Sequence, residues 1–191
     1  MSTSTFKSRL TMEKKLLVLD LDETLIHSSE KRLADGESFL IHNFFVYKRP
    51  YLDWFMSEML NTFEVAIWSA AGHDYVHSVI CHLFQRDSLK FVWTSQNCTL
   101  SKNVNTGEYD IIKNLRKLKN RGYPLESIVV IDDSSAKHRR NYGNLVTVKE
   151  FLGDQNDNDL QLLAAYLKQL AKVPNIRNVE KRGWRTQVGG I

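Results

Sequence analysis

The sequence predicts an α/β domain with a doubly wound, mainly parallel sheet. Short apolar runs, typical of buried strands, alternate with longer stretches whose apolar residues recur every three or four positions. Such alternation is typical of strand–helix–strand units, in which the strands lie parallel. The length of 191 residues, with 42% hydrophobic and 25% charged residues, fits one globular domain with its own core.

Apolar runs mark the expected core strands, and their ranges are 16–19, 63–68, 127–131 and 145–148, with a shorter strand at 91–93. Helices are expected where apolar side chains share one helical face, beginning near Pro50, His73, Asp110 and Asp157. Pro50 suits a first helical position, where its missing N–H costs nothing. Between the first strand and the first helix, the apolar stretch 38–47 and the Asp35-Gly36 turn signal predict a small β-hairpin flap.

The basic character of the chain belongs to its end. Residues 172–191 carry Lys172, Arg177, Lys181, Arg182 and Arg185 against Glu180 alone, and the body is neutral. We therefore expect a flexible segment at 1–13, one domain at 14–172, and a solvated, weakly ordered basic tail at 173–191. A neutral body does not favour nucleic acid as a partner.

The sequence shows no export signal and no membrane span. Its polar start lacks the apolar centre of a Sec-type signal peptide, so a cytoplasmic location is expected, with a specialised secretion route as the alternative. No window approaches the roughly 18 apolar residues of a membrane span. Cys81 and Cys98 match no metal spacing and are expected to be buried, reduced thiols. The oligomeric state is left open.

The stretch Asp20-Leu21-Asp22-Glu23-Thr24 closes the first predicted strand. In an open parallel sheet, ligands bind at the edge where strands end. An aspartate there can attack phosphorus if a divalent cation offsets the repulsion between anions. A second aspartate two residues later can donate a proton and then activate water. The alternative for a bare Asp-x-Asp pair is the capped start of a helix.

Polar groups also follow two other predicted strands. Ser69 ends the second core strand, just before a helix whose backbone N–H groups could cradle a phosphate, although serine there is more often a cap. Asp132 and Asp133 end the third core strand, and a metal such as Mg²⁺ would relieve their repulsion. Lys113 falls one turn into the predicted helix from Asp110, on the side away from the core, where an exposed lysine is normally solvated.

The run Val18-Leu19-Asp20-Leu21-Asp22-Glu23-Thr24-Leu25 resembles the first motif of haloacid-dehalogenase-like (HAD) phosphatases, with its Asp-x-Asp-x-Thr signature. The continuation Ile26-His27-Ser28 and the stretch Tyr47-Lys48-Arg49-Pro50 resemble the small CTD-phosphatase, or NLI-interacting-factor-like, branch. Ser69, Lys113 and Asp132-Asp133 follow in the order of the family's other three motifs. The resemblance covers roughly Lys14 to Lys172 and implies a HAD-like Rossmannoid core.

The resemblance also implies roles for these residues. Asp20 would form an aspartyl-phosphate and Asp22 would protonate the leaving oxygen, while Ser69 and Lys113 would hold the phosphoryl oxygens. Thr24 would brace the loop through its hydroxyl. Mg²⁺ would be bound by Asp20, the main-chain carbonyl of Asp22, and Asp133, with Asp132 in or near its shell.

The resemblance further implies a phosphoprotein substrate. Metabolite phosphatases of this fold usually carry a cap domain, but the insertions at 25–47 and 94–108 are too short for one, so we expect a capless domain with an open cleft. Phosphotyrosine is slightly favoured over phosphoserine or phosphothreonine. The fourth motif reads Asp-Asp-Ser-Ser where the branch commonly has Asp-Asn and Ser-Pro, and flap aromatics could stack on a phenyl ring: Phe39, Phe44, Phe45 and Tyr47. The alternatives are a non-catalytic protein-binding scaffold and a small-molecule or nucleic-acid-end phosphatase.

Overall fold

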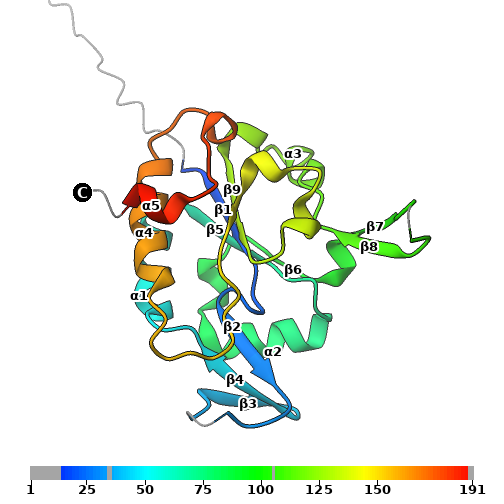
Figure 1. Cartoon of the computed structure of the whole chain (residues 1–191), viewed down its shortest axis with the longest axis vertical. Coiled ribbons are helices and arrows are strands. Elements are labelled where there is room, and N and C mark those ends of the chain that lie inside the picture. The colour runs from blue at the N-terminus through cyan, green and yellow to red at the C-terminus, as the bar shows by residue number, and fades with distance from the viewer. Residues whose placement is uncertain (1–13, 34–35, 105, 189–191) are drawn as a thin grey trace, which may run out of the picture.

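A five-stranded parallel sheet forms the centre of the computed structural model, which describes residues 14–33, 36–104 and 106–188 (Figure 1). The strand order is β10-β9-β1-β5-β6. The strands are β1 (Leu16–Leu19), β5 (Glu64–Trp68), β6 (Val92–Trp93), β9 (Ile128–Asp132) and β10 (Leu145–Thr147). Each lies at a predicted apolar run, so the α/β prediction with a parallel sheet is confirmed.

Helices cover both faces of this sheet, but unequally. Alternate side chains of β1, such as Leu17 and Leu19, pack with α1, α2, α4 and α5 in the larger core cluster. Their neighbours Leu16 and Val18 pack on the opposite face with α3. The helices are α1 (Leu52–Thr62), α2 (His73–Leu83), α3 (Arg116–Lys119), α4 (Asp159–Leu170) and α5 (Trp184–Val188). Short 3₁₀ turns connect the elements: η1 (Arg86–Ser88), η2 (Ser95–Asn97), η3 (Leu125–Ser127), η4 (Ser135–His138), η5 (Tyr142–Asn144) and η6 (Ile176–Asn178).

The predicted flap is present as a small antiparallel sheet at the carboxyl edge of the central sheet (Figure 1). It contains β2 (Ile26–Ser29), β3 (Phe39–Ile41) and β4 (Phe44–Lys48), in the order β2-β4-β3. The β3–β4 turn lies at His42-Asn43, with His42 in the left-handed region at φ 51°. The other expected turn signal, Asp35-Gly36, includes residue 35, which lies outside the described residues.

Two local predictions about helices are wrong. Pro50 precedes α1 instead of occupying its first turn, because Tyr51 adopts a left-handed conformation at the helix start. The helix expected from Asp110 is a strand: β7 (Thr99–Lys102) and β8 (Tyr109–Ile112) form an antiparallel hairpin. The cross-strand pairing, for example of Leu100 with Ile111, outweighs the tendency of the helically spaced apolar residues to form a helix. As a result, α3 begins only at Arg116. The hairpin projects from the body in Figure 1.

The C-terminal segment is not the solvated tail that the charge pattern predicts. Through Val188, the last described residue, it packs on the body: Ile176 and Trp184 are buried, and α5 lies against α4 (Figure 1). The Trp184 indole N–H donates to the carbonyl of Thr147 on the edge strand β10 at 2.9 Å. Lys181 is also buried and donates to main-chain carbonyls. Single buried apolar residues hold the segment against the body. They do not recur at helical spacing, so the sequence gives no sign of this packing. The predicted flexible segment at 1–13 lies outside the described residues.

Two remaining features concern cysteines and membranes. Cys81 is exposed on α2 and Cys98 is half-buried, so the expectation of two buried thiols is wrong, although both are free. Within the described ranges, no helix combines the length and the apolar character that a bilayer crossing requires.

Candidate active site

Asp20 lies at the carboxyl edge of the sheet, directly after β1. In the sheet register Leu19 pairs with Ile67 on one side and Ile131 on the other, so the three strands end together. The Asp20 main-chain N–H donates to the Ile131 carbonyl at 2.9 Å. The side chain is only 2% exposed. The sheet therefore places Asp20 beside Asp132, the last residue of β9.

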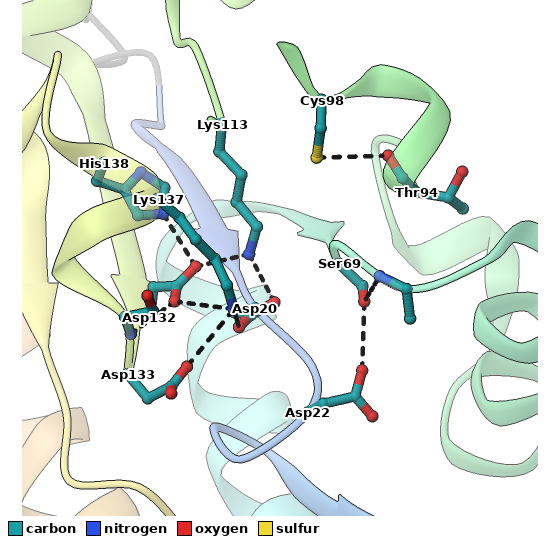
Figure 2. A network of polar contacts seen from close by, with 12 residues as sticks. Asp20, Asp22, Ser69, Thr94, Cys98, Lys113, Asp132, Asp133, Lys137 and His138 are labelled. Carbon is teal, nitrogen blue, oxygen red and sulfur yellow. Dashed lines mark hydrogen bonds and ion pairs between the residues drawn. The ribbon is translucent and has the colours of Figure 1, made fainter. Parts of the chain in front are cut away.

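Lys113 bridges these two aspartates (Figure 2). Its ammonium lies 2.6 Å from Asp20 Oδ1 and 2.6 Å from Asp132 Oδ2, and the residue is 1% exposed. Lys113 follows β8, and its main-chain N–H donates to the Lys137 carbonyl at 2.9 Å, which fixes the backbone beneath the side chain. The expectation that Lys113 points away from the core is wrong, because it depended on the helix that the β7–β8 hairpin replaces.

Asp132 is the more strongly stabilised of the two carboxylates. Besides Lys113, it contacts His138 Nε2 at 2.9 Å and accepts the main-chain N–H of Ser134 at 2.9 Å. Burial alone would raise the pKa of Asp132, but the charge of Lys113 and the contact with His138 outweigh it and hold this pKa well below its usual range. For His138 burial acts in the other direction and lowers the pKa of the imidazole. Asp132 is therefore held in its ionised form.

Asp20 shows the opposite shift. Burial raises the pKa of Asp20 above its ordinary value, the charge of Lys113 opposes this, and the charge of Asp132 adds to it. A bound divalent cation would shift the balance toward the ionised form, because a metal is the largest charge in such a site. The arrangement therefore fits a nucleophile that needs a cation beside it.

The neighbouring carboxylates fit a magnesium ion. Asp20, Asp132 and Asp133 each offer an oxygen within 4.8 Å of the others. Asp133 Oδ1 is buried and accepts no hydrogen bond from the described residues. Burial and then the charge of Asp132 raise the pKa of Asp133. Carboxylate oxygens are the ligands that Mg²⁺ prefers, and the ion usually retains several waters, so a carboxylate oxygen without a hydrogen bond beside two other carboxylates fits this ion.

Lys137 is a second lysine in this cluster, and the sequence analysis did not identify it. Its ammonium lies 3.5 Å from Asp20 Oδ2, 3.8 Å from Asp132 Oδ1 and 3.9 Å from Asp133 Oδ1 (Figure 2). Burial alone would lower the pKa of Lys137, but the charges of these carboxylates, Asp20 first, raise it above its ordinary value. Lys137 therefore carries a positive charge throughout the physiological range.

Asp22 points away from this cluster, toward the start of α2 (Figure 2). The Tyr75 hydroxyl donates to Asp22 Oδ1 at 2.5 Å and lies 2.5 Å from Ser28 Oγ. The Ser69 hydroxyl lies 3.3 Å from Asp22 Oδ2 and accepts the main-chain N–H of Ala71 at 3.0 Å. Burial and the charge of Asp22 raise the pKa of Tyr75, so its hydroxyl remains a donor. These contacts fix the orientation of the Asp22 carboxyl group.

Thr24 supports the loop in a different way from the one predicted. Its hydroxyl is buried and makes no hydrogen bond to any described residue, so the expected hydroxyl brace is wrong. The turn is closed instead by main-chain bonds, including those from the N–H groups of Leu25 and Ile26 to the Leu21 carbonyl. The Thr24 carbonyl accepts a hydrogen bond from Arg49 Nη1 at 2.9 Å.

The flap aromatics do not form the expected open wall. Tyr47 is buried, and its hydroxyl accepts the main-chain N–H of Leu33. Phe39 stacks on His82 and Phe44 packs edge-on against Tyr75, so both rings are occupied by α2. Packing within the domain therefore uses three of the four rings that were expected to stack on a phenyl group.

The structure thus brings the predicted residues together in two groups. Asp20, Lys113, Asp132 and Asp133 form one group, and Asp22 with Ser69 forms the second. Sequence reasoning missed Tyr75, Lys137 and His138. Lys137 follows Asp133 by four residues, a spacing that brings side chains together in a helical turn.

The parallel sheet, the flap and the acidic cluster at the carboxyl edge define the class: a capless HAD-like phosphatase domain. A family model described as NLI interacting factor-like phosphatase matches residues 15–177. The chain therefore belongs to the NLI-interacting-factor-like phosphatase family, whose domains are phosphoric monoester hydrolases, and the resemblance seen in the sequence is confirmed.

Individual proteins agree with this placement. Phosphatase Herzog of Drosophila melanogaster is 31% identical over 179 residues, which cover 90% of this chain and 48% of that protein. The CTD nuclear envelope phosphatase 1 homolog of Caenorhabditis elegans is 30% identical over 199 residues, covering 95% of this chain and 77% of that protein. The chain spans about half the length of Herzog and of several other relatives. The solved structure of Fcp1, an RNA polymerase II CTD phosphatase, shares the fold, with a TM-score of 0.52 and 17% identity over 92% of this chain and 61% of that chain.

Proposed function

We propose that this domain is a Mg²⁺-dependent phosphoprotein phosphatase that works through an aspartyl-phosphate on Asp20. The observation that carries the proposal is the pairing of a buried carboxylate, Asp20, with a buried ammonium, Lys113, at 2.6 Å, next to two further carboxylates. A carboxylate is a competent nucleophile toward phosphorus when its own charge and that of the phosphoryl group are offset. Lys113 supplies one offsetting charge at a fixed position.

In the first half of the reaction, a carboxylate oxygen of Asp20 attacks phosphorus and the bond to the leaving oxygen breaks. Asp22 gives its proton to that oxygen, and the hydrogen bond from the Tyr75 hydroxyl holds the Asp22 carboxyl group in place. In the second half, Asp22 takes a proton from water, which attacks phosphorus and releases phosphate and Asp20. The Ser69 hydroxyl and Lys113 ammonium bind the phosphoryl oxygens.

Asp20, Asp132, Asp133 and the main-chain carbonyl of Asp22 would hold Mg²⁺. Bound there, the ion supplies positive charge against the phosphoryl oxygens and lowers the repulsion between Asp20 and the incoming anion. The protein's own contribution is to keep Asp132 ionised through its contacts with Lys113 and His138, so that this residue is negatively charged when the ion binds.

A phosphorylated side chain of a protein is the proposed substrate. The insertions after β1 and β6 form only the small flap and the β7–β8 hairpin, so no helical cap closes over the described part of the site. An open site suits a phosphorylated side chain carried on an extended peptide. The names of relatives such as the CTD nuclear envelope phosphatase 1 homolog support this substrate class. Because packing occupies most flap aromatics, the structure adds no support for phosphotyrosine over phosphoserine or phosphothreonine.

The test compares kcat/KM for phosphotyrosine and phosphoserine peptides with matched flanks against sugar phosphates, nucleotides and a 3′-phosphorylated oligonucleotide, all with Mg²⁺. The best phosphopeptide should be the best substrate. A tenfold or greater preference for any non-protein substrate would contradict the substrate class. No activity on any compound would leave the scaffold alternative as the better reading.

A further inference from the structure

Lys137 lies where the oxygens of the acidic cluster converge. Its ammonium is 3.5, 3.8 and 3.9 Å from one oxygen each of Asp20, Asp132 and Asp133. These three carboxylates are the ones that could hold a metal ion. Lys113 contacts the other oxygen of Asp20 and the other oxygen of Asp132. The two lysines therefore differ in position. Lys113 is enclosed between two carboxylates, whereas Lys137 faces all three carboxylates that could hold the metal ion.

The two lysines also differ in how tightly they are held. Lys113 makes two contacts of 2.6 Å, whereas the contacts of Lys137 begin at 3.5 Å, and two of them are too long for hydrogen bonds. The Lys137 side chain is 28% exposed, against 1% for Lys113. A lysine has four flexible methylene groups. Lys137 can therefore turn toward solvent without breaking a close contact, and Lys113 cannot.

We propose that Lys137 is an internal cation that competes with Mg²⁺ for the cluster of Asp20, Asp132 and Asp133, so that the ion binds only as the Lys137 side chain swings out. The inference rests on the proposed function in one respect, the identity of the metal. An ammonium and a metal ion cannot share the same oxygens, because like charges a few ångströms apart repel strongly away from bulk water. Lys137 thereby weakens Mg²⁺ binding while it stabilises the metal-free carboxylates.

The experiment uses the full chain, stripped of metal, and the variant Lys137→Met, which keeps the length of the side chain and removes its charge. Isothermal titration with MgCl₂ near neutral pH should give a Kd lower than that of the wild type by about tenfold or more. The melting temperature of the variant should fall without metal and recover when Mg²⁺ saturates. A purely structural role would lower the melting temperature under both conditions.

Two further variants serve as controls. Lys119→Met removes a lysine charge at an exposed position on α3 and should leave the Kd unchanged, which excludes a general effect of net charge. Lys137→Arg retains the charge and should keep the Kd near that of the wild type. Lys137→Gln replaces Lys137→Met if the methionine variant does not fold.

The outcomes separate this proposal from the proposed function. A Kd for Lys137→Met within about twofold of the wild-type value overturns the competition. A Kd that falls equally in Lys119→Met overturns it as well. If no protein in the series binds Mg²⁺, the metal assignment fails together with the competition. Phosphatase activity is not needed for any of these readouts.

Discussion

Arg49 and Asp157, 108 residues apart in sequence, form two hydrogen bonds of 2.9 and 2.8 Å, one to each carboxylate oxygen. The Arg49 side chain is fully buried, lies over the Phe151 ring, and also donates to the carbonyl of Thr24 in the loop that carries Asp20 and Asp22. One guanidinium thus connects the start of α1, the segment before α4 and the loop that follows β1.

Replacing Arg49 should therefore lower the free energy of unfolding of the whole domain. Arg49→Ala leaves Asp157 and the Thr24 carbonyl without their partner, and removing one member of a buried pair costs about 3–5 kcal/mol. Urea unfolding measures this loss. Lys48→Ala, which removes an exposed pair with Asp53, is the matched control and should cost less than about 1 kcal/mol. Equal losses for the two variants would contradict the anchoring role of Arg49.

Asp20→Asn should abolish turnover while the fold is retained. The change is nearly isosteric, but an amide cannot form the aspartyl-phosphate, and kcat should fall by at least about a thousandfold. Steady-state kinetics with Mg²⁺ and a phosphopeptide measures the loss, and circular dichroism checks the fold. Asn114→Asp, an equally small exchange outside the acidic cluster, is the control. Activity of more than a few per cent of the wild-type value in Asp20→Asn would rule out Asp20 as the nucleophile.

Tyr75→Phe should slow the chemical step without changing substrate binding. The hydroxyl donates to Asp22 Oδ1 at 2.5 Å, and a misplaced catalytic group can lower the rate by up to about a hundredfold. We expect kcat to fall and KM to stay nearly constant. Tyr123→Phe removes a hydroxyl that contacts Glu64 on β5 and should have no such effect. A change in KM alone would mean that Tyr75 binds substrate and does not orient Asp22.

Asp159 should make the stability of the domain depend on pH. Burial opposes the shift, but the hydrogen bond and charge of Arg185, and then the charge of Arg49, lower the pKa of Asp159 below its ordinary value. The stabilisation is therefore present above the unfolded pKa of about 3.9 and is lost as the pH falls through the lower folded pKa.

The unfolding free energy of Asp159→Asn, measured from neutral to acidic pH, should lie below that of the wild type at neutral pH, and the gap should narrow as the solution becomes acidic. Asp74→Asn, on the exposed side of α2, should follow the wild-type curve. A gap between the wild type and Asp159→Asn that stays constant down to the lowest pH would show that the Asp159 charge contributes nothing.

The strands and most site residues could be predicted because their signals are local. An apolar run followed by Asp20, Ser69 or Asp132 marks both a strand and the place where it ends. The β7–β8 hairpin was missed because Ile111 falls at helical spacing from residues in α3, and only pairing with β7 decides between strand and helix. The cytoplasmic location stays a prediction.

Lys137 and Tyr75 could not be predicted for a different reason. Each reaches the site from a helical turn, and nothing in the neighbouring sequence states which way its side chain points. The packing of the C-terminal segment on the body could not be predicted either, because its buried residues Ile176 and Trp184 are single apolar positions among basic residues. In all three cases at least one deciding contact joins residues distant in sequence: Lys137 with Asp20, Tyr75 with Asp22, and Trp184 with Thr147.

The contact between Trp184 and the Thr147 carbonyl has a consequence for how molecules of this protein meet one another. β10 is an outer strand of the sheet, and an uncovered outer strand offers its main-chain groups to other chains. A chain shortened to Lys172 would lose this cover and would also uncover Tyr166, whose ring lies 5.7 Å from that of Trp184. Such a chain should therefore be more prone to self-association, strand to strand, than a chain that retains the C-terminal segment.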